Sequence, residues 1–243
     1  KAQWGNLTTA LTWNCQITPK LSGSFTGAYS RNISMYDYVE GSRFFSDGEQ
    51  TSMTGMERSN RSTIDDMGYR MEFDYRPGSN HHIRFGSNYL HHIYHPQSTV
   101  SRNQTDRDTL STENASSYKG NEVAFYVEDE MRLSSRTKLN AGLHYTLYQT
   151  DGKMYHSLEP RLAMSYQCSE KATMKVSYTE MSQFAHQLSN TYLNLPTDSW
   201  VPSTRKVRPM RSRQVAAGIY TELPWHISLN VEGYYRTTSQ LLE

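Results

Sequence analysis

Histidines are the residues of this sequence with the most versatile chemistry. Nine occur among the 243 residues, and a group of them gathers in one short stretch, at His81, His82, His91, His92 and His95. Imidazole binds transition metals and transfers protons near neutral pH. In an extended strand, however, His91 and His92 point to opposite faces, and His91 and His95 lie about 13 Å apart on one face. The spacing therefore favours polar wall residues, with no metal site and no cofactor.

A second candidate is the segment 190–208, which mixes aromatic and cationic side chains. The candidate substrate-binding residues in it are Tyr192, Trp200, Arg205 and Arg208, with Lys206 between the two arginines. Aromatic faces suit sugar rings and other flat ligands, and neighbouring prolines stiffen the segment. The alternative is that these aromatic residues belong to a belt at a membrane interface, where Trp and Tyr are enriched.

A third set consists of charged residues at alternating positions. Its members are Glu122, Glu128, Glu130, Arg132, Glu159, Arg161 and Glu232. Opposing charges on a wall can hold another part of a protein or can simply be hydrated. We favour these two roles over catalysis, and we predict that the chain is not an enzyme.

These side chains must be positioned by strands, because the surrounding pattern alternates with period two. In 122–133, Val123, Phe125 and Val127 fall on one face, whereas Glu122 and Glu128 fall on the other. The segments 138–149, 157–167 and 226–235 alternate in the same way. An Arg or Lys facing lipid at the middle of a membrane costs about 2–4 kcal/mol. We therefore expect the charged face to line a hydrated interior.

The connections between strands alternate between short and long. Tight polar turns are predicted at 18–20, 77–80, 134–136, 169–171 and 223–224, and long polar loops near 37–60, 96–118 and 185–208. A further connection at 150–152 is short although it falls on the long-loop side. About ten strands result, most of 12 residues or more, whereas ordinary strands average about 5–6. Strand length and loop asymmetry together predict an all-β fold, an antiparallel transmembrane β-barrel.

Composition excludes several other classes. Only 36% of the residues are hydrophobic, and no run approaches the roughly 20 apolar residues of a spanning helix. Aromatic residues make up 12%, which argues against disorder. A net charge of +1 gives no support for nucleic-acid binding. Cys15 and Cys168 are too few for a disulfide framework, and the strand map separates them.

An ordered succession of short motifs between 158 and 235 carries a family resemblance. The motifs are Leu158-Glu159-Pro160-Arg161-Leu162, Lys175-Val176-Ser177-Tyr178, Met181-Ser182-Gln183, Leu195-Pro196-Thr197-Asp198-Ser199-Trp200-Val201-Pro202-Ser203, Val207-Arg208-Pro209, Arg211-Ser212-Arg213-Gln214, Gly218-Ile219-Tyr220 and Val231-Glu232-Gly233-Tyr234-Tyr235. This succession resembles the barrel of TonB-dependent outer-membrane receptors, especially those of Bacteroidetes. The specific motifs cover roughly a third of the chain.

The resemblance implies a 22-stranded barrel closed by an N-terminal plug and the import of a scarce nutrient such as a glycan, siderophore or cobalamin. Residues 1–243 would form a partial barrel domain, an open curved sheet if isolated, without plug or TonB box. No secretion signal opens the chain, and the last residues fall where a strand meets a loop, so we expect a piece of a longer protein. The implied partners are outer-membrane lipid, the plug domain of the parent chain, the TonB system and a surface lipoprotein; nucleic acid is not among them.

The alternative hypothesis is a complete ten-stranded outer-membrane barrel enzyme of the omptin type. Such an enzyme places acidic residues and a histidine at its outer rim, and Asp65, Asp66, Asp106, Asp108 and His186 are available. No local motif supports them. The sequence also contains no glycine-rich phosphate loop, zinc-binding helix or nucleophile elbow.

Overall fold

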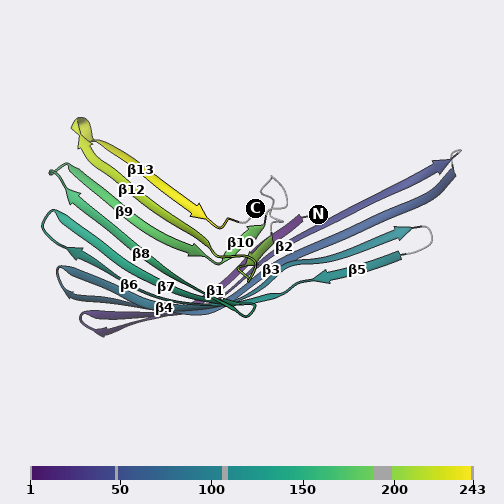
Figure 1. The fold of residues 1–243 in the computed structure, drawn as a ribbon, viewed down its shortest axis with the longest axis horizontal. Coiled ribbons are helices and arrows are strands. Elements are labelled where there is room, and N and C mark those ends of the chain that lie inside the picture. Colours follow the sequence, from purple (N-terminus) through teal and green to yellow (C-terminus); the bar gives the residue numbers. More distant parts are fainter. Residues whose placement is uncertain (1, 47–48, 106–108, 189–198, 242–243) are drawn as a thin grey trace.

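A computed structural model describes residues 2–46, 49–105, 109–188 and 199–241, and these residues form antiparallel strands almost throughout (Figure 1). One 11-stranded sheet contains β1 (Ala2–Thr18), β2 (Leu21–Ser46), β3 (Glu49–Gly78), β4 (His81–Thr105), β5 (Thr109–Ala115), β6 (Tyr118–Arg132), β7 (Thr137–Thr150), β8 (Lys153–Gln167), β9 (Ala172–Gln183), β12 (Met210–Leu223) and β13 (Ile227–Ser239). A second sheet pairs β10 (Ala185–Leu188) with β11 (Ser199–Pro202). A single 3-10 turn, η1 (Pro224–His226), joins β12 to β13. No helix in the described ranges is long and apolar enough to cross a membrane.

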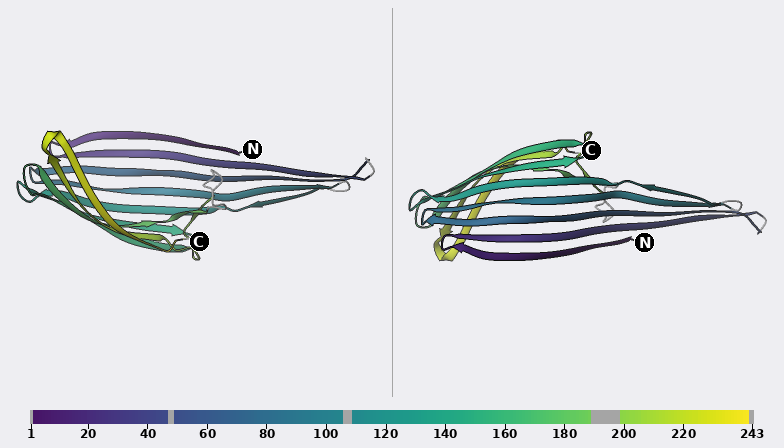
Figure 2. Two further views of the ribbon diagram at one scale, coloured as in Figure 1. Left: turned by 90° about the horizontal axis from the view of Figure 1, so that it is seen from above. Right: turned by 90° about the horizontal axis from the view of Figure 1, so that it is seen from below.

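The sheet is open, as predicted. Its strands follow the order β1-β2-β3-β4-β6-β7-β8-β9-β12-β13, and β5 pairs only with β4. Strands β1 and β13 therefore form its two ends, and the sheet curves like the wall of a barrel (Figures 1 and 2). The predicted tight turns at 18–20, 77–80, 134–136, 169–171 and 223–224 all fall between paired strands, as does the turn at 150–152.

Two predicted long loops are wrong. Residues 37–60 and 96–118 mostly continue the strands: the β2–β3 ladder reaches Ser46↔Glu49, and the β4–β5 ladder reaches Gln104↔Thr109. Strands β2, β3 and β4 have 26, 30 and 25 residues, against 12 in β9, so their hairpins project far beyond the remaining strands (Figure 2). The sequence of these segments is rich in polar residues and lacks sustained apolar alternation, which is why it resembles the sequence of a loop.

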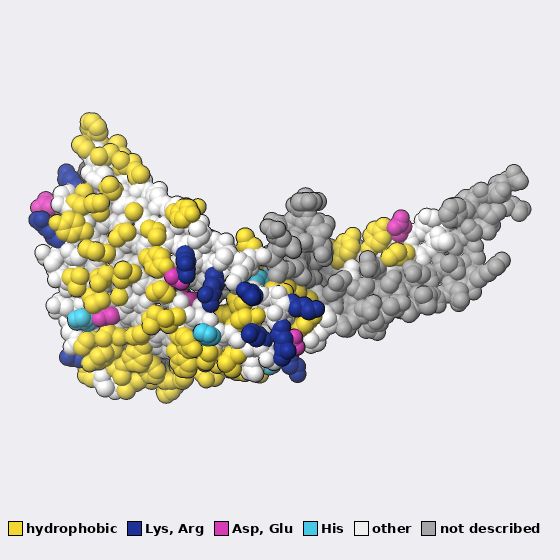
Figure 3. All heavy atoms as spheres, in the orientation of Figure 1, with side chains coloured by type: hydrophobic (Ala, Val, Ile, Leu, Met, Phe, Trp, Pro, Cys, Tyr) yellow, Lys and Arg dark blue, Asp and Glu magenta, His cyan; other side chains and the backbone are white. Residues whose placement is uncertain are grey.

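The two faces of the sheet differ as the alternation predicts. Register aligns Val127, Leu143 and Pro160 across β6, β7 and β8 on one face, and Glu128, Gly142 and Arg161 on the other. Apolar side chains of the first face are unusually exposed, with Leu158 at 58% and Phe125 at 52%. Figure 3 shows hydrophobic side chains covering this region. So large an exposed apolar surface fits contact with lipid; we call it the outer face.

Aromatic rings form a band on the outer face close to the tight turns. Trp13 stacks on Phe25 with ring centroids 5.4 Å apart, and Phe25 meets Phe73 edge to face at 5.8 Å. Phe73 in turn stacks on Phe85 at 5.1 Å. Cross-strand aromatic pairs stabilise neighbouring strands. A belt of this kind is typical of the interface between a membrane barrel and water.

Candidate binding site on the inner wall

The opposite, inner face carries all the predicted lumen charges. By register Glu122, Glu128, Glu130, Arg132, Glu159, Arg161 and Glu232 lie on it. Several are paired: Arg84 donates a hydrogen bond to Glu128, and Glu159 lies 3.5 Å from the His144 Nδ1 and 3.8 Å from an Arg161 nitrogen. Close by, the His92 Nδ1 lies 2.6 Å from an Asp66 oxygen. Glu128, Glu159 and Arg161 thus have polar partners on the wall, whereas Glu122, Glu130, Arg132 and Glu232 form no ion pair with the described residues.

Glu159 has an additional structural role at a seam between β8 and β9. The β8–β9 ladder ends at Arg161↔Thr179, although both strands continue beyond it. Past that point the Ser182 amide donates to the Glu159 carboxylate at 3.1 Å, and the Ser157 and Ser182 hydroxyls lie 2.7 Å apart. The Glu159 side chain is only 6% exposed. A side chain therefore replaces the missing backbone partner, as a buried amide requires.

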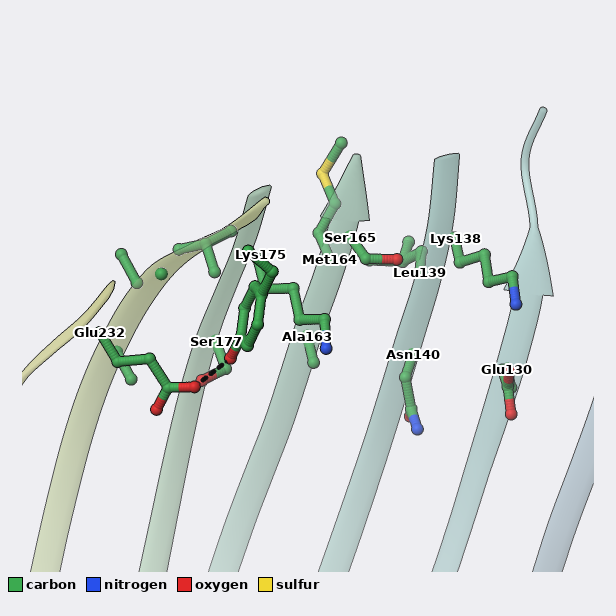
Figure 4. Close-up of a pocket in the computed structure, with 15 residues that line it drawn as sticks. Glu130, Lys138, Leu139, Asn140, Ala163, Met164, Ser165, Lys175, Ser177 and Glu232 are labelled. Atoms are coloured by element: carbon green, nitrogen blue, oxygen red, sulfur yellow. Dashed lines mark hydrogen bonds between the residues drawn. The ribbon is translucent and has the colours of Figure 1, made fainter. Parts of the chain in front are cut away.

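Near the tight turns, the inner face has a hollow of about 440 Å³ (Figure 4). Small residues at its floor, Ala163 and Ser177, leave this space. Tyr220 donates a hydrogen bond to Glu232, and the Lys175 ammonium lies 4.1 Å from the centre of the Tyr220 ring. Predicted lumen residues Glu130 and Glu232 line this hollow from opposite sides.

Beyond the other end of the seam, the β10–β11 hairpin folds back onto the inner wall. Phe184, which precedes the hairpin, stacks on Tyr148 of β7 with ring centroids 4.8 Å apart. Their exposed fractions are 6% and 0%. The His186 Nε2 lies 3.0 Å from the Ser203 Oγ, and the Ser203 amide donates to the Phe184 carbonyl at 2.7 Å. The Phe184–Tyr148 contact therefore holds the hairpin against the inner wall, and the His186–Ser203 and Ser203–Phe184 contacts join its two arms.

Burial lowers the pKa of His186, and a hydrogen bond with the Arg208 backbone opposes this shift. A neutral imidazole bonded to a serine hydroxyl suits a buried position. Sequence reasoning did not find this anchor. The only available signal was the run of apolar and small polar residues around Phe184 and Pro202, which a loop exposed to water does not need.

A tight turn follows the hairpin and carries two of the predicted substrate-binding residues. The Thr204 amide donates to the Val207 carbonyl at 2.9 Å, and the Thr204 hydroxyl accepts from the Val207 amide at 3.3 Å. Arg205 and Arg208 are exposed on this turn. Trp200 lies within the hairpin itself, opposite Gln187, and is half-buried. Tyr192 lies outside the described residues.

The histidine stretch is spread over both faces of β4. On the outer face His81 lies 2.7 Å from an Asp129 oxygen and His91 lies 2.9 Å from an Asn121 oxygen. On the inner face His82 contacts Asp74 at 2.5 Å. Within the described ranges no group of three potential ligands is arranged to hold a metal ion. Each of these histidines is instead used in a pairwise contact.

The residues considered for an omptin-type site do not come together. Asp65 accepts a hydrogen bond from Tyr29 at 2.7 Å and pairs with Arg31 at 3.2 Å on the outer face. Its neighbour Asp66 pairs with His92 on the inner face. His186 is buried in the hairpin. Residues 106 and 108 lie outside the described part of the chain.

A family model matches nearly the whole chain. The model of the family described as TonB dependent receptor-like, beta-barrel matches residues 2–243. A comparison with curated proteins finds no match. Among solved structures, the ferric preacinetobactin receptor BauA from Acinetobacter baumannii is similar at a TM-score of 0.58 and 12% identity, over 96% of this chain and 37% of that one.

Two other structures show the same fold. The RagAB peptide transporter gives a TM-score of 0.63 at 10% identity, over 99% of this chain and 31% of that one. The ferric yersiniabactin uptake receptor FyuA from Yersinia pestis gives 0.59 at 10% identity, over 98% and 36%. This chain thus spans about a third of the length of the structures that it resembles.

Proposed function

Because the chain belongs to the family of TonB-dependent receptor-like β-barrels, we propose that it forms part of the wall of a receptor that binds a scarce nutrient and imports it. Membership of this family places the chain in the outer membrane of Gram-negative bacteria. The observation that carries the proposal is the division of one sheet into an apolar outer face and a charged inner face. Such a wall separates lipid from a water-filled passage.

The proposed activity is binding and gated passage, with no covalent step. Hairpins on the side opposite the tight turns would catch the nutrient, and a plug inside the barrel would hold it until the TonB system supplies energy. Glu122, Glu128, Glu130, Arg132, Glu159, Arg161 and Glu232 would face the plug or hydrate the passage. Tyr192, Trp200, Arg205 and Arg208 would contact the nutrient.

The proposed partners follow from this arrangement. The outer face would contact membrane lipid, and the inner face would contact the plug domain of the parent chain. A surface lipoprotein would cover the outer opening if the nutrient is a glycan or a peptide. The similar structures include receptors named for a ferric siderophore and a transporter named for peptides, so the nutrient class stays open among glycans, siderophores, cobalamin and peptides.

A growth experiment tests the proposal. One strain lacks the gene that encodes the parent protein and another lacks TonB, and both are grown in media that each limit one nutrient class. We expect both strains to fail on the same medium, and the parent gene to restore growth to the first. Uptake of that nutrient in labelled form should stop when a protonophore collapses the inner-membrane gradient. Normal growth of the first strain on every medium would refute the proposal, as would failure where the strain without TonB grows.

A further inference from the structure

A group of exposed cations gathers at the turn that follows β11 and at the start of β8. Arg205, Lys206 and Arg208 project from the turn after β11, and Lys153 begins β8 beside it; we call these four residues the cationic turn. All four are exposed, and among the described residues none forms an ion pair. An anion that binds at this turn gains Coulomb free energy from each cation that it approaches.

The cationic turn is fixed in place before any ligand arrives. The Tyr155 hydroxyl donates to the Thr204 carbonyl at 2.7 Å and joins the turn to β8. One Arg205 nitrogen would lie 3.3 Å from a Cβ added at Gly152, so its guanidinium rests against the β7–β8 turn. On the other side, the buried contact between His186 and Ser203 holds the preceding hairpin. A rigid site loses little entropy on binding, which raises affinity.

The position of the turn indicates which side of the wall it serves. Tyr155 shares the inner face with Ser157 and Glu159, and Phe184 stacks on the inner-face residue Tyr148. Cations on the outer face are arranged differently. Arg213 lies two residues beyond the apolar Val215 on β12, about 7 Å along the strand, and pairs with Glu180 at 3.4 Å. Outer-face cations of this kind lie on the apolar side of the sheet, whereas the cationic turn is joined to the inner-face residue Tyr155.

We propose that the cationic turn is an anion-binding site, and that the imported nutrient carries carboxylate or phosphate groups that it recognises. This inference rests on the proposed function, because it names the chemical class of that nutrient. Arg205 and Arg208 each offer a planar fork of donors, which matches the two oxygens of a carboxylate or phosphate. Lys153 and Lys206 add positive charge, and a lysine ammonium does not require one particular orientation of the anion.

The test uses the full-length parent receptor in detergent and measures binding by calorimetry. Citrate serves as the carboxylate probe, inorganic pyrophosphate as the phosphate probe and glucose as the uncharged control. The variant R205Q/K206Q/R208Q removes three cations from the turn. The matched control K119Q/R211Q/R213Q removes three from the outer face, where register places Lys119, Arg211 and Arg213.

We expect the receptor to bind at least one anionic probe and not glucose, and binding to weaken as salt is raised. The turn variant should bind at least about ten-fold more weakly, because charge-assisted hydrogen bonds to two arginines are lost. The outer-face control should bind as the unmodified receptor does. R205K/R208K keeps the charge and should retain part of the affinity. Heat-dependent migration on gels checks that every variant forms a folded barrel.

Three results would overturn the inference. They are no binding of either anion by the unmodified receptor, equal affinity in the turn variant, and loss of affinity in the outer-face control instead. The last would place the anion-binding site on the outer face. None of these results affects the proposed function, because TonB-dependent growth is measured separately with an unmodified receptor.

Discussion

Replacing Phe184 by alanine should release the β10–β11 hairpin from the inner wall. Phe184 is 6% exposed and stacks at 4.8 Å on Tyr148, which is fully buried. Truncating a buried phenylalanine costs about 3–5 kcal/mol. The hairpin itself contains only the four residue pairs from Ala185↔Pro202 to Leu188↔Ser199. Because so short a ladder has little stability of its own, the loss should open this region locally and leave the large sheet intact.

Hydrogen exchange measures this opening directly. The Ser203 amide donates to the Phe184 carbonyl at 2.7 Å across the two arms of the hairpin, so it is protected only while the hairpin is formed. Because the short ladder depends on docking for its stability, faster exchange there reports undocking. If opening becomes easier by about 3 kcal/mol, amides in 199–207 should exchange roughly 100-fold faster. The measurement follows peptides of the full-length receptor in detergent by mass spectrometry. Peptides from β6 and β7 report whether the sheet stays folded.

A matched control separates anchoring from loss of an aromatic side chain in general. Phe125 is 52% exposed on the outer face, and Phe125→Ala should leave exchange in 199–207 unchanged. Acceleration of less than about five-fold in the Phe184 variant would contradict the reasoning, and so would equal acceleration in both variants. The first result would mean that backbone and polar contacts dock the hairpin. The second would mean that the whole wall had loosened.

Three further predictions concern the wall itself. Glu159→Ala should lower the free energy of unfolding by about 1–3 kcal/mol, because the Ser182 amide loses its acceptor. Glu159→Gln keeps an oxygen at this position and should recover most of the loss. An equal loss in both variants would contradict the role of Glu159 as the acceptor for Ser182. Leu162→Arg, on the outer face, should cost up to about 2–4 kcal/mol in folding into lipid vesicles. Ala163→Arg, on the inner face, should cost far less, and similar costs would reverse our assignment of the faces. Lowering the pH should undock the hairpin, because burial depresses the pKa of His186 below its ordinary value of 6.5. The undocked form then binds more protons than the docked form. The free energy that His186 contributes to docking is therefore fully present above pH 6.5 and declines below it. Exchange in 199–207, corrected for its intrinsic pH dependence, should therefore rise between pH 7.5 and 5.5, and His186→Gln should remove that rise.

The strands of the sheet could be predicted from the sequence where contact with lipid requires apolar side chains on one face. Between β6 and β13 each strand must be apolar on the outer face, so residues such as Val127 and Leu143 alternate visibly with Glu128 and Gly142. The tight turns could be predicted equally well, because short polar or proline-containing segments separate these strands. Outside the membrane that constraint disappears. The sequences that extend β2, β3 and β4 lack the sustained apolar alternation of the other strands, so they do not differ visibly from loop sequences.

The candidate site could be predicted only in part, for a different reason. The faces of Glu122, Glu128 and Arg161 follow from period two, because each lies in a regular ladder. The docking of Phe184 on Tyr148 depends on contacts between segments far apart in the sequence, which no local pattern encodes. The sequence shows the cationic residues of the turn, but it does not show whether they lie on the passage side or the lipid side. The hydrogen bond from Tyr155 to Thr204 in the structure answers that question.

The seam between β8 and β9 explains why one hairpin enters the barrel while others project from it. The β2–β3 ladder runs with a single irregularity to its tip, so backbone hydrogen bonds fix the direction of both strands. At β9 the ladder with β8 stops at Thr179, and only β12 still guides the strand to Gln183. The Gln183 side chain then donates to the Ala185 carbonyl at 2.7 Å, and the chain turns inward to bury Phe184. Glu159 accepts the hydrogen bond of the Ser182 amide that β8 no longer pairs, and so lowers the free-energy cost of this departure. Although Glu159 forms no hydrogen bond or ion pair with the described residues of the cationic turn, it thereby helps to position that turn on the inner wall.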